Sequence, residues 1–158
     1  MTTDLLQNWL KQHLPDIPVQ IVDTGQPAGD CICMALCDVG AVEHFLPNRL
    51  DGSRPLRVRM TYRLTAPFAR PEDGHRVLCE IMFAALENPI AHGPDGALIP
   101  VEVLASATAH DRFGPQPGAG LYLEIVAERP ARARHAPPVL EPAVINAGQS
   151  HAPSRPGS

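Results

Sequence analysis

The sequence predicts an α+β fold: a compact single domain whose mainly antiparallel sheet packs against an N-terminal helix and a central helix. Two observations carry this prediction. Apolar and polar residues alternate at residues 54–66, as in a strand, and apolar residues recur at helical spacing at residues 71–88. The 158 residues suffice for one domain with a substantial core. We place this domain at residues 1–128, followed by a Pro/Ala-rich, flexible arm at residues 129–158 that we expect to be disordered in the free protein.

The first predicted helix lies at the N-terminus and is amphipathic. Thr2 or Thr3 can cap it, and Asp4 places a negative charge in its first turn, where the helix dipole favours one. Pro15 ends it. One side carries Leu5, Leu6, Trp9, Leu10 and either His13 or Leu14. Because so short a helix is unstable alone, this side must pack against the rest of the domain.

Two strands are predicted next, at residues 18–23 and 31–39. The second is largely apolar, so we expect it inside the sheet rather than at its edge. It carries three of the four cysteines: Cys31, Cys33 and Cys37. His44 follows them, which raises the question of a metal site, but C-x-C-x3-C is not a usual structural zinc spacing. We therefore expect buried or half-buried free thiols, and no metal or cofactor.

The long strand at residues 54–66 follows a turn-rich loop at residues 41–55 and has two unlike faces. Its apolar face carries Leu56, Val58, Met60, Tyr62 and Leu64. We expect this face to be buried against the helix that follows. The expected contacts of Tyr62 and Leu64 are with Ile81, Met82 and Ala85.

The opposite face of this strand is basic. It carries Arg57, Arg59 and Arg63, interspersed with Thr61 and Thr65. A solvated outer face is common in antiparallel sheets and would account for such a pattern. The alternative is that the three arginines contact another subunit in an assembly. We therefore predict Arg57, Arg59 and Arg63 as interface residues.

The central helix is predicted at residues 71–88. Pro71 suits the first helical position, and Glu72 and Asp73 lie at the positive end of the helix dipole. Asn88 and the proline after it end the helix. Its apolar stripe contains Val77, Leu78, Ile81, Met82, Ala85 and Leu86.

Two further strands are predicted, at residues 99–105 and 120–128, after a turn at residues 91–96. A Gly/Pro-rich segment at residues 111–118 separates them. One face of the last strand carries Leu121, Leu123, Ile125 and Ala127, and the other carries Tyr122, Glu124, Val126 and Glu128.

The C-terminal arm contains one apolar cluster: Val139, Leu140, Val144 and Ile145. The arm cannot bury enough apolar surface to fold alone. We predict that these four residues dock on a neighbouring subunit, by adding a strand to an exposed sheet edge. The alternative is an unused tail.

Composition and motifs narrow the function classes. The net charge of −4 argues against a dedicated nucleic-acid binder, and no apolar run is long enough to span a bilayer. The N-terminus lacks the pattern of a secretory signal, so we expect cytoplasmic synthesis. We find no phosphate-binding glycine loop, no G-x-S-x-G and no H-E-x-x-H, and the histidines are scattered. We therefore predict no catalytic residues and no enzyme activity.

The segment PLRVRMTYRLTAPFARPEDGHRVLCEIMFAALENPI resembles the tail terminator, or cap, proteins of phage-tail-like contractile injection systems. The family signature is a strand with alternating apolar residues ending in Tyr-x-Leu-Thr-Ala, an acidic helix start, and a helix ending in Ala-Leu-x-x-x-Pro. Here these parts are residues 60–66, Glu72 and residues 85–89. The resemblance covers most of residues 1–128. The short segment at residues 111–118 departs from it, because the family often has a bulky, Trp-containing segment there.

This resemblance implies a structural subunit. It implies a hexameric ring that sits on the end of the inner tube and sheath, stops their growth, and is assembled into the particle in the cytoplasm without catalysis. Its implied partners are further copies of the chain, the tube protein and the sheath protein, with no nucleic acid and no membrane span. Two alternatives remain: a phage tail completion or neck protein, and a small α+β enzyme or ligand-binding domain that uses Cys and His residues.

Overall fold

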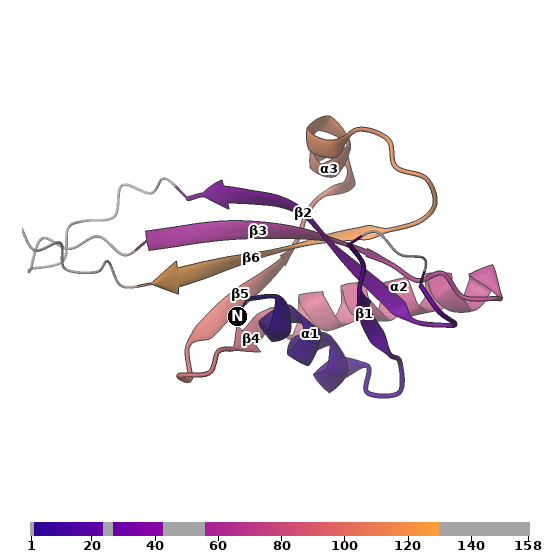
Figure 1. Cartoon of the computed structure of the whole chain (residues 1–158), viewed down its shortest axis with the longest axis horizontal. Helices are drawn as coiled ribbons and strands as arrows, with labels where there is room; N and C mark the ends of the chain where they lie inside the picture. The colour runs from indigo at the N-terminus through magenta and orange to yellow at the C-terminus, as the bar shows by residue number, and fades with distance from the viewer. Residues whose placement is uncertain (1, 24–26, 43–55, 130–158) are drawn as a thin grey trace, which may run out of the picture.

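The computed structural model describes residues 2–23, 27–42 and 56–129. In chain order the elements are α1 (Thr2–His13), β1 (Val19–Ile21), β2 (Ile32–Ala41), β3 (Leu56–Thr65), α2 (Pro71–Glu87), β4 (Ile90–His92), β5 (Leu98–Val103), α3 (Ser106–Phe113) and β6 (Leu121–Arg129), as Figure 1 shows. The loop predicted at residues 41–55 and the arm at residues 129–158 lie almost wholly outside the described residues.

Within the described residues, the strands form one six-stranded sheet in the order β1-β2-β3-β6-β5-β4. β1 runs parallel to β2, and every other neighbouring pair is antiparallel. β3 pairs along its length with β6, which follows it by more than fifty residues in the sequence. The predicted α+β class, the mainly antiparallel sheet and the interior position of β2 are confirmed.

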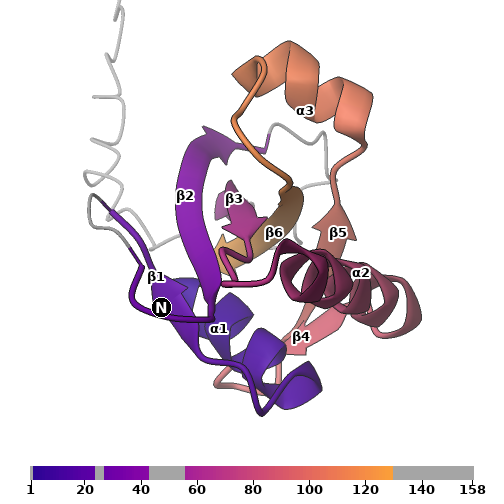
Figure 2. The same cartoon turned by 90° about the vertical axis from the view of Figure 1, so that its right-hand side faces the viewer.

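Helices α1 and α2 cover one face of the sheet, and α3 lies against the other (Figure 2). Leu6, Trp9 and Leu10 of α1 are buried in the core beneath the sheet, as their helical spacing predicts. The indole Nε1 of Trp9 also donates a hydrogen bond to the backbone oxygen of Asn88 at 3.2 Å. This bond joins α1 to the end of α2, so the two helices form one layer.

The predicted packing of β3 on α2 is confirmed for its central residues. Tyr62, Leu64, Ile81 and Ala85 lie together in the buried core. Met82 and Leu86 were expected on the same stripe, and for them the prediction is wrong, because Met82 is half-buried and Leu86 is exposed. Each stands one residue, about 100°, further round the helix than Ile81 and Ala85. The buried side of α2 is therefore narrower than the sequence predicts.

Two short elements were not predicted from the sequence. β4 occupies part of the segment expected to be a turn, and pairs with β5. α3 precedes the Gly/Pro-rich segment and ends at Gly114. Ala109 is its single buried residue, so α3 lacks the apolar stripe that would reveal a helix in the sequence.

A bulge in β2 changes the expected position of one cysteine. Cys31 and Cys33 are buried free thiols, as predicted, but Cys37 is exposed. The pairing of β2 with β3 shifts between Leu36 and Asp38, which leaves Cys37 as the extra residue. The alternation that places Cys37 with the other two therefore stops at the bulge.

The outer parts of β2, β3 and β6 extend beyond the helices as a three-stranded projection (Figure 1). We call residues 36–41, 56–60 and 126–129 the blade. The apolar face of β3 was expected to be buried throughout, and within the blade this is wrong, because Leu56 and Val58 are exposed. β1 pairs only with residues 32–34 of β2, and β5 only with residues 123–125 of β6. The core thus ends where the sheet narrows to three strands.

Candidate functional site

The basic face of β3 forms the floor of a charged surface beneath α3. Across this face Arg57 lies opposite Glu128, and Thr61 lies between Asp38 and Glu124. The guanidinium of Arg57 contacts the carboxylate of Glu128 at 2.9 Å. The positive charges of Arg57 and Arg59 are therefore matched by carboxylates on the adjacent strand β6.

Arg112 of α3 joins these strands from above. Its Nη2 donates to Oδ2 of Asp38 at 2.6 Å, and its Nη1 donates to Oε2 of Glu124 at 2.9 Å. The hydrogen bond to Glu124 is the largest of the effects that raise the pKa of Arg112 above its ordinary value. The same Glu124 oxygen accepts from the hydroxyl of Thr61 at 3.1 Å and lies 3.7 Å from Nε of Arg59. Arg112 thereby fastens α3 across β2, β3 and β6.

Arg63 has a different role from the other two predicted interface residues. Its Nη2 donates to the backbone oxygen of Pro117 at 2.9 Å and approaches that of Gly118 at 3.4 Å. Both oxygens belong to the segment between α3 and β6. Arg63 therefore anchors this segment on the sheet, and its guanidinium is already used within the subunit.

The structure thus places Arg57, Arg59 and Arg63 on one face, as predicted, and gives each a contact within the chain. The sequence analysis did not identify Arg112 or Asp38 as part of this surface. Glu124 and Glu128 lie on one face of β6, and this pattern was the one sign in the sequence that carboxylates belong to the charged surface. Val139, Leu140, Val144 and Ile145, the other predicted interface residues, lie outside the described residues.

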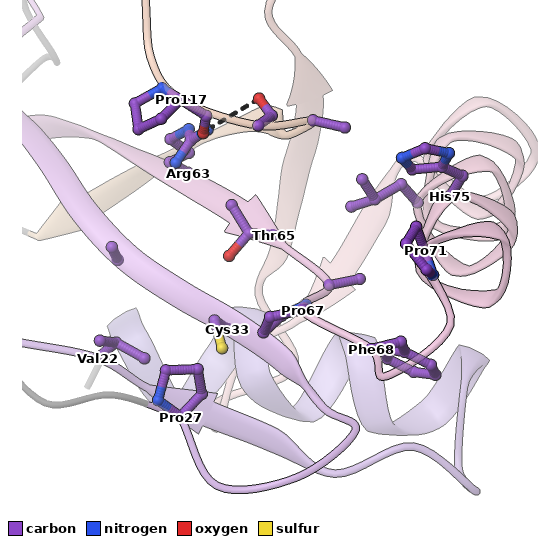
Figure 3. A pocket seen from close by; sticks show the side chains of 15 residues that line it. Val22, Pro27, Cys33, Arg63, Thr65, Pro67, Phe68, Pro71, His75 and Pro117 are labelled. Atoms are coloured by element: carbon purple, nitrogen blue, oxygen red, sulfur yellow. Dashed lines mark hydrogen bonds between the residues drawn. The ribbon is translucent and has the colours of Figure 1, made fainter.

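A pocket of about 560 Å³ opens beside the end of β3, where the chain turns into α2 (Figure 3). Its wall includes Cys33, Thr65, Phe68 and His75, together with several prolines. The Sγ atoms of Cys33 and Cys31 lie 3.6 Å apart as free thiols. Burial, and next the neighbouring Cys31, raise the pKa of Cys33 to about 11. Cys33 is therefore protonated at neutral pH, which is the unreactive form of a thiol.

The four thiols should react at two distinct rates. We expect Cys37 and Cys79, which are exposed, to be alkylated readily by iodoacetamide at pH 8, whereas Cys31 and Cys33 react only once the protein unfolds. Mass spectrometry of tryptic peptides before and after addition of denaturant measures this. Equal labelling of all four thiols in the native protein would contradict the buried positions of Cys31 and Cys33.

Residues 2–23, 27–42 and 56–129 contain no group of three or more His, Cys, Asp or Glu side chains placed to hold a metal ion. Among the same residues, no helix has the length and apolar character needed to cross a membrane.

No family model matches the sequence, and no curated protein matches it. Solved structures do match its fold. The sheath/tube terminator of PVC, an extracellular contractile injection system, in its extended state has a TM-score of 0.59 at 13% identity, over 99% of this chain and 63% of that one. The tube-terminating cap of the anti-feeding prophage has a TM-score of 0.58 at 12% identity, over 99% and 59%.

The resemblance to tail terminator proteins is therefore confirmed at the level of the fold. This chain spans about three fifths of the length of either cap protein.

Proposed function

We propose that this chain is a structural subunit of the cap that terminates the inner tube and sheath of a contractile, phage-tail-like injection particle. The observation that carries the proposal is the likeness in fold to two cap proteins over 99% of this chain. The β3–α2 motif of the sequence supports it independently. In this role the protein binds other proteins and catalyses no reaction.

The proposed assembly is a hexameric ring. The ring sits on the last layer of the tube and contacts the sheath, after synthesis and assembly in the cytoplasm. A closed ring requires two unlike surfaces on each subunit, because each copy contacts its two neighbours head to tail. The charged surface beneath α3 is our candidate for one of them, with Arg57 and Arg59 as its outward-facing cations.

The test is a capping assay with the tube and sheath proteins of the same particle. Electron microscopy should show tubes of limited length with extra density at one end when this protein is present, and longer, uneven tubes without it. Native mass spectrometry of the protein alone measures the ring. If tube length does not respond to the protein and no oligomer forms even at high concentration, the proposal is wrong.

Reversal of two charges tests the proposed interface. Arg57 and Arg59 are 28% and 38% exposed, so their ion pairs within the chain contribute little stability, about 0–1 kcal/mol each. We expect the variant R57E/R59E to keep its melting temperature within a few degrees but to lose capping, because the contact with the next subunit is repelled. Circular dichroism and the capping assay provide the two readouts.

A charge swap is the matched control for this variant. R57E/E128R re-forms the pair between β3 and β6 with its signs exchanged. If Arg57 contacts another subunit, the swap has the melting temperature of the parent protein but does not restore capping. If the swap restores both, Arg57 acts only through Glu128 and the interface lies elsewhere.

A further inference from the structure

The blade has an apolar face that α1 and α2 do not reach (Figure 1). Four large aliphatic residues on it remain exposed: Leu36 50%, Val39 57%, Leu56 58% and Val58 36%. The strand register places them on one side, since Val39 pairs with Met60, and Val58 pairs with both Ala41 and Ala127. Single exposed aliphatic residues are ordinary, but four on one face of the adjacent strands β2 and β3 form a patch that needs a partner.

The other face of the blade cannot serve as its buried side. It carries the ion pairs of Arg57 with Glu128 and of Arg59 with Glu124. A sheet with one charged face and one apolar face is stable in water when a second layer covers the apolar face. α1 and α2 are that layer for the rest of the sheet, so the blade requires a separate one.

The chain leaves the described structure beside this patch. Leu56 pairs with Arg129, so the start of β3 and the end of β6 lie next to each other. The arm therefore continues from the end of the blade. Its large aliphatic residues are confined to residues 139–145. The apolar patch and the apolar segment at residues 139–145 are thus joined by one short spacer.

The spacer has a suitable length. Val139 lies ten positions after Arg129 in the sequence. A flexible chain of that length has a root-mean-square span of about 16–19 Å. The centre of the patch, at Val39, lies two strands across from Ile125, which is four residues back along β6. Strand dimensions make that distance roughly 17 Å. The local concentration of a tethered segment is highest when its span matches the distance in this way.

We propose that residues 139–145 cover the apolar face of the blade of the same copy and supply its second layer. The segment packs on the face through Val139, Leu140, Val144 and Ile145 rather than adding a strand to an edge, because Pro142 at its centre has no backbone N–H to donate. The sequence alone predicts that the arm docks on a neighbouring subunit, whereas this proposal places it on its own copy. It is independent of the proposed function.

Photocrosslinking of the full chain tests the proposal. A benzophenone amino acid replaces Val39, at the centre of the patch, and in a control variant it replaces Leu98, which is exposed on β5 away from the blade. Trypsin releases the arm from His135 onwards, because Arg155 precedes a proline. We expect the probe at position 39 to crosslink to this arm peptide within residues 139–145, and the probe at position 98 to give no such product.

Further measurements show which segment or molecule covers the apolar face of the blade. An equal mixture of ¹⁵N-labelled and unlabelled protein at low concentration should give crosslinks within single copies only. Adding L140D/I145D to the probe at position 39 should abolish the product, whereas a Ser150→Asp variant, outside the segment, should leave it unchanged. Crosslinks from position 39 to residues 43–55, to a second copy, or to nothing would each overturn the proposal.

Discussion

Replacing Leu64 or Ile81 with alanine is expected to lower the free energy of unfolding by about 2–5 kcal/mol. Both side chains are fully buried, and they belong to the same core where β3 packs on α2. The loss has two parts: apolar area returned to water and a cavity that close-packed neighbours cannot fill. Urea unfolding followed by circular dichroism measures it, at one fixed protein concentration so that any oligomer affects all variants alike.

The matched control is Leu98→Ala on β5. Leu98 is exposed, so the same deletion of atoms should change the unfolding free energy by no more than about 0.5 kcal/mol. Values near zero for both Leu64→Ala and Ile81→Ala would show that β3 turns its other face to the helices.

Gly74→Ala is expected to destabilise the domain, although the substitution normally favours a helix by roughly 0.5–1 kcal/mol. Gly74 is buried in the first turn of α2, against the residue that follows β3. A Cβ atom there would lie 2.3 Å from the backbone oxygen of Ala66, a distance at which one segment has to move. We expect a net loss of about 1–3 kcal/mol, as for other overpacked sites, and a lower melting temperature.

Gly40→Ala provides the comparison for this variant. The nearest atom to a Cβ at that position is the end of the Arg59 side chain at 3.5 Å, which is an ordinary contact. Its melting temperature should therefore remain close to that of the parent protein. A Gly74→Ala protein as stable as the parent would mean that α2 begins further from β3 than the structure places it.

The pairing of a long strand with the helix after it could be predicted from the sequence because each has its own period. Tyr62 and Leu64 fall on the apolar face by alternation, and Ile81 and Ala85 repeat every four residues. α3 and β4 could not be predicted in the same way. Each is too short to show a period. β4 depends on its pairing with β5, and α3 depends on the bonds of Arg112 to Asp38 and Glu124.

The charged surface was predictable only in part, because its contacts join residues that are far apart in the sequence. The arginines of β3 show in the sequence as a basic face, but their neutralisation depends on which strands become neighbours. Asp38 and Arg112 lie 74 residues apart, and a bulge in β2 sets the position of Asp38. Likewise, alternation predicted a buried face along the whole of β3, but the helices end before the blade. The length of the helices relative to the strand decides where burial of this face ends.

The position of β6 in the sheet determines the order in which the domain can form during synthesis. β6 is the last strand of the domain, but it lies between β3 and β5. β1, β2 and β3 can pair as soon as they leave the ribosome, and so can β4 with β5, but the two groups cannot join until β6 has been made. Until then one edge of β3 offers unpaired backbone groups to other nascent chains, the condition in which intermediates aggregate. Pairing across so many residues is also slow, because a long loop has to close first. We therefore expect yields in cells to depend on translation rate and chaperone supply more strongly than the stability of the finished subunit would indicate.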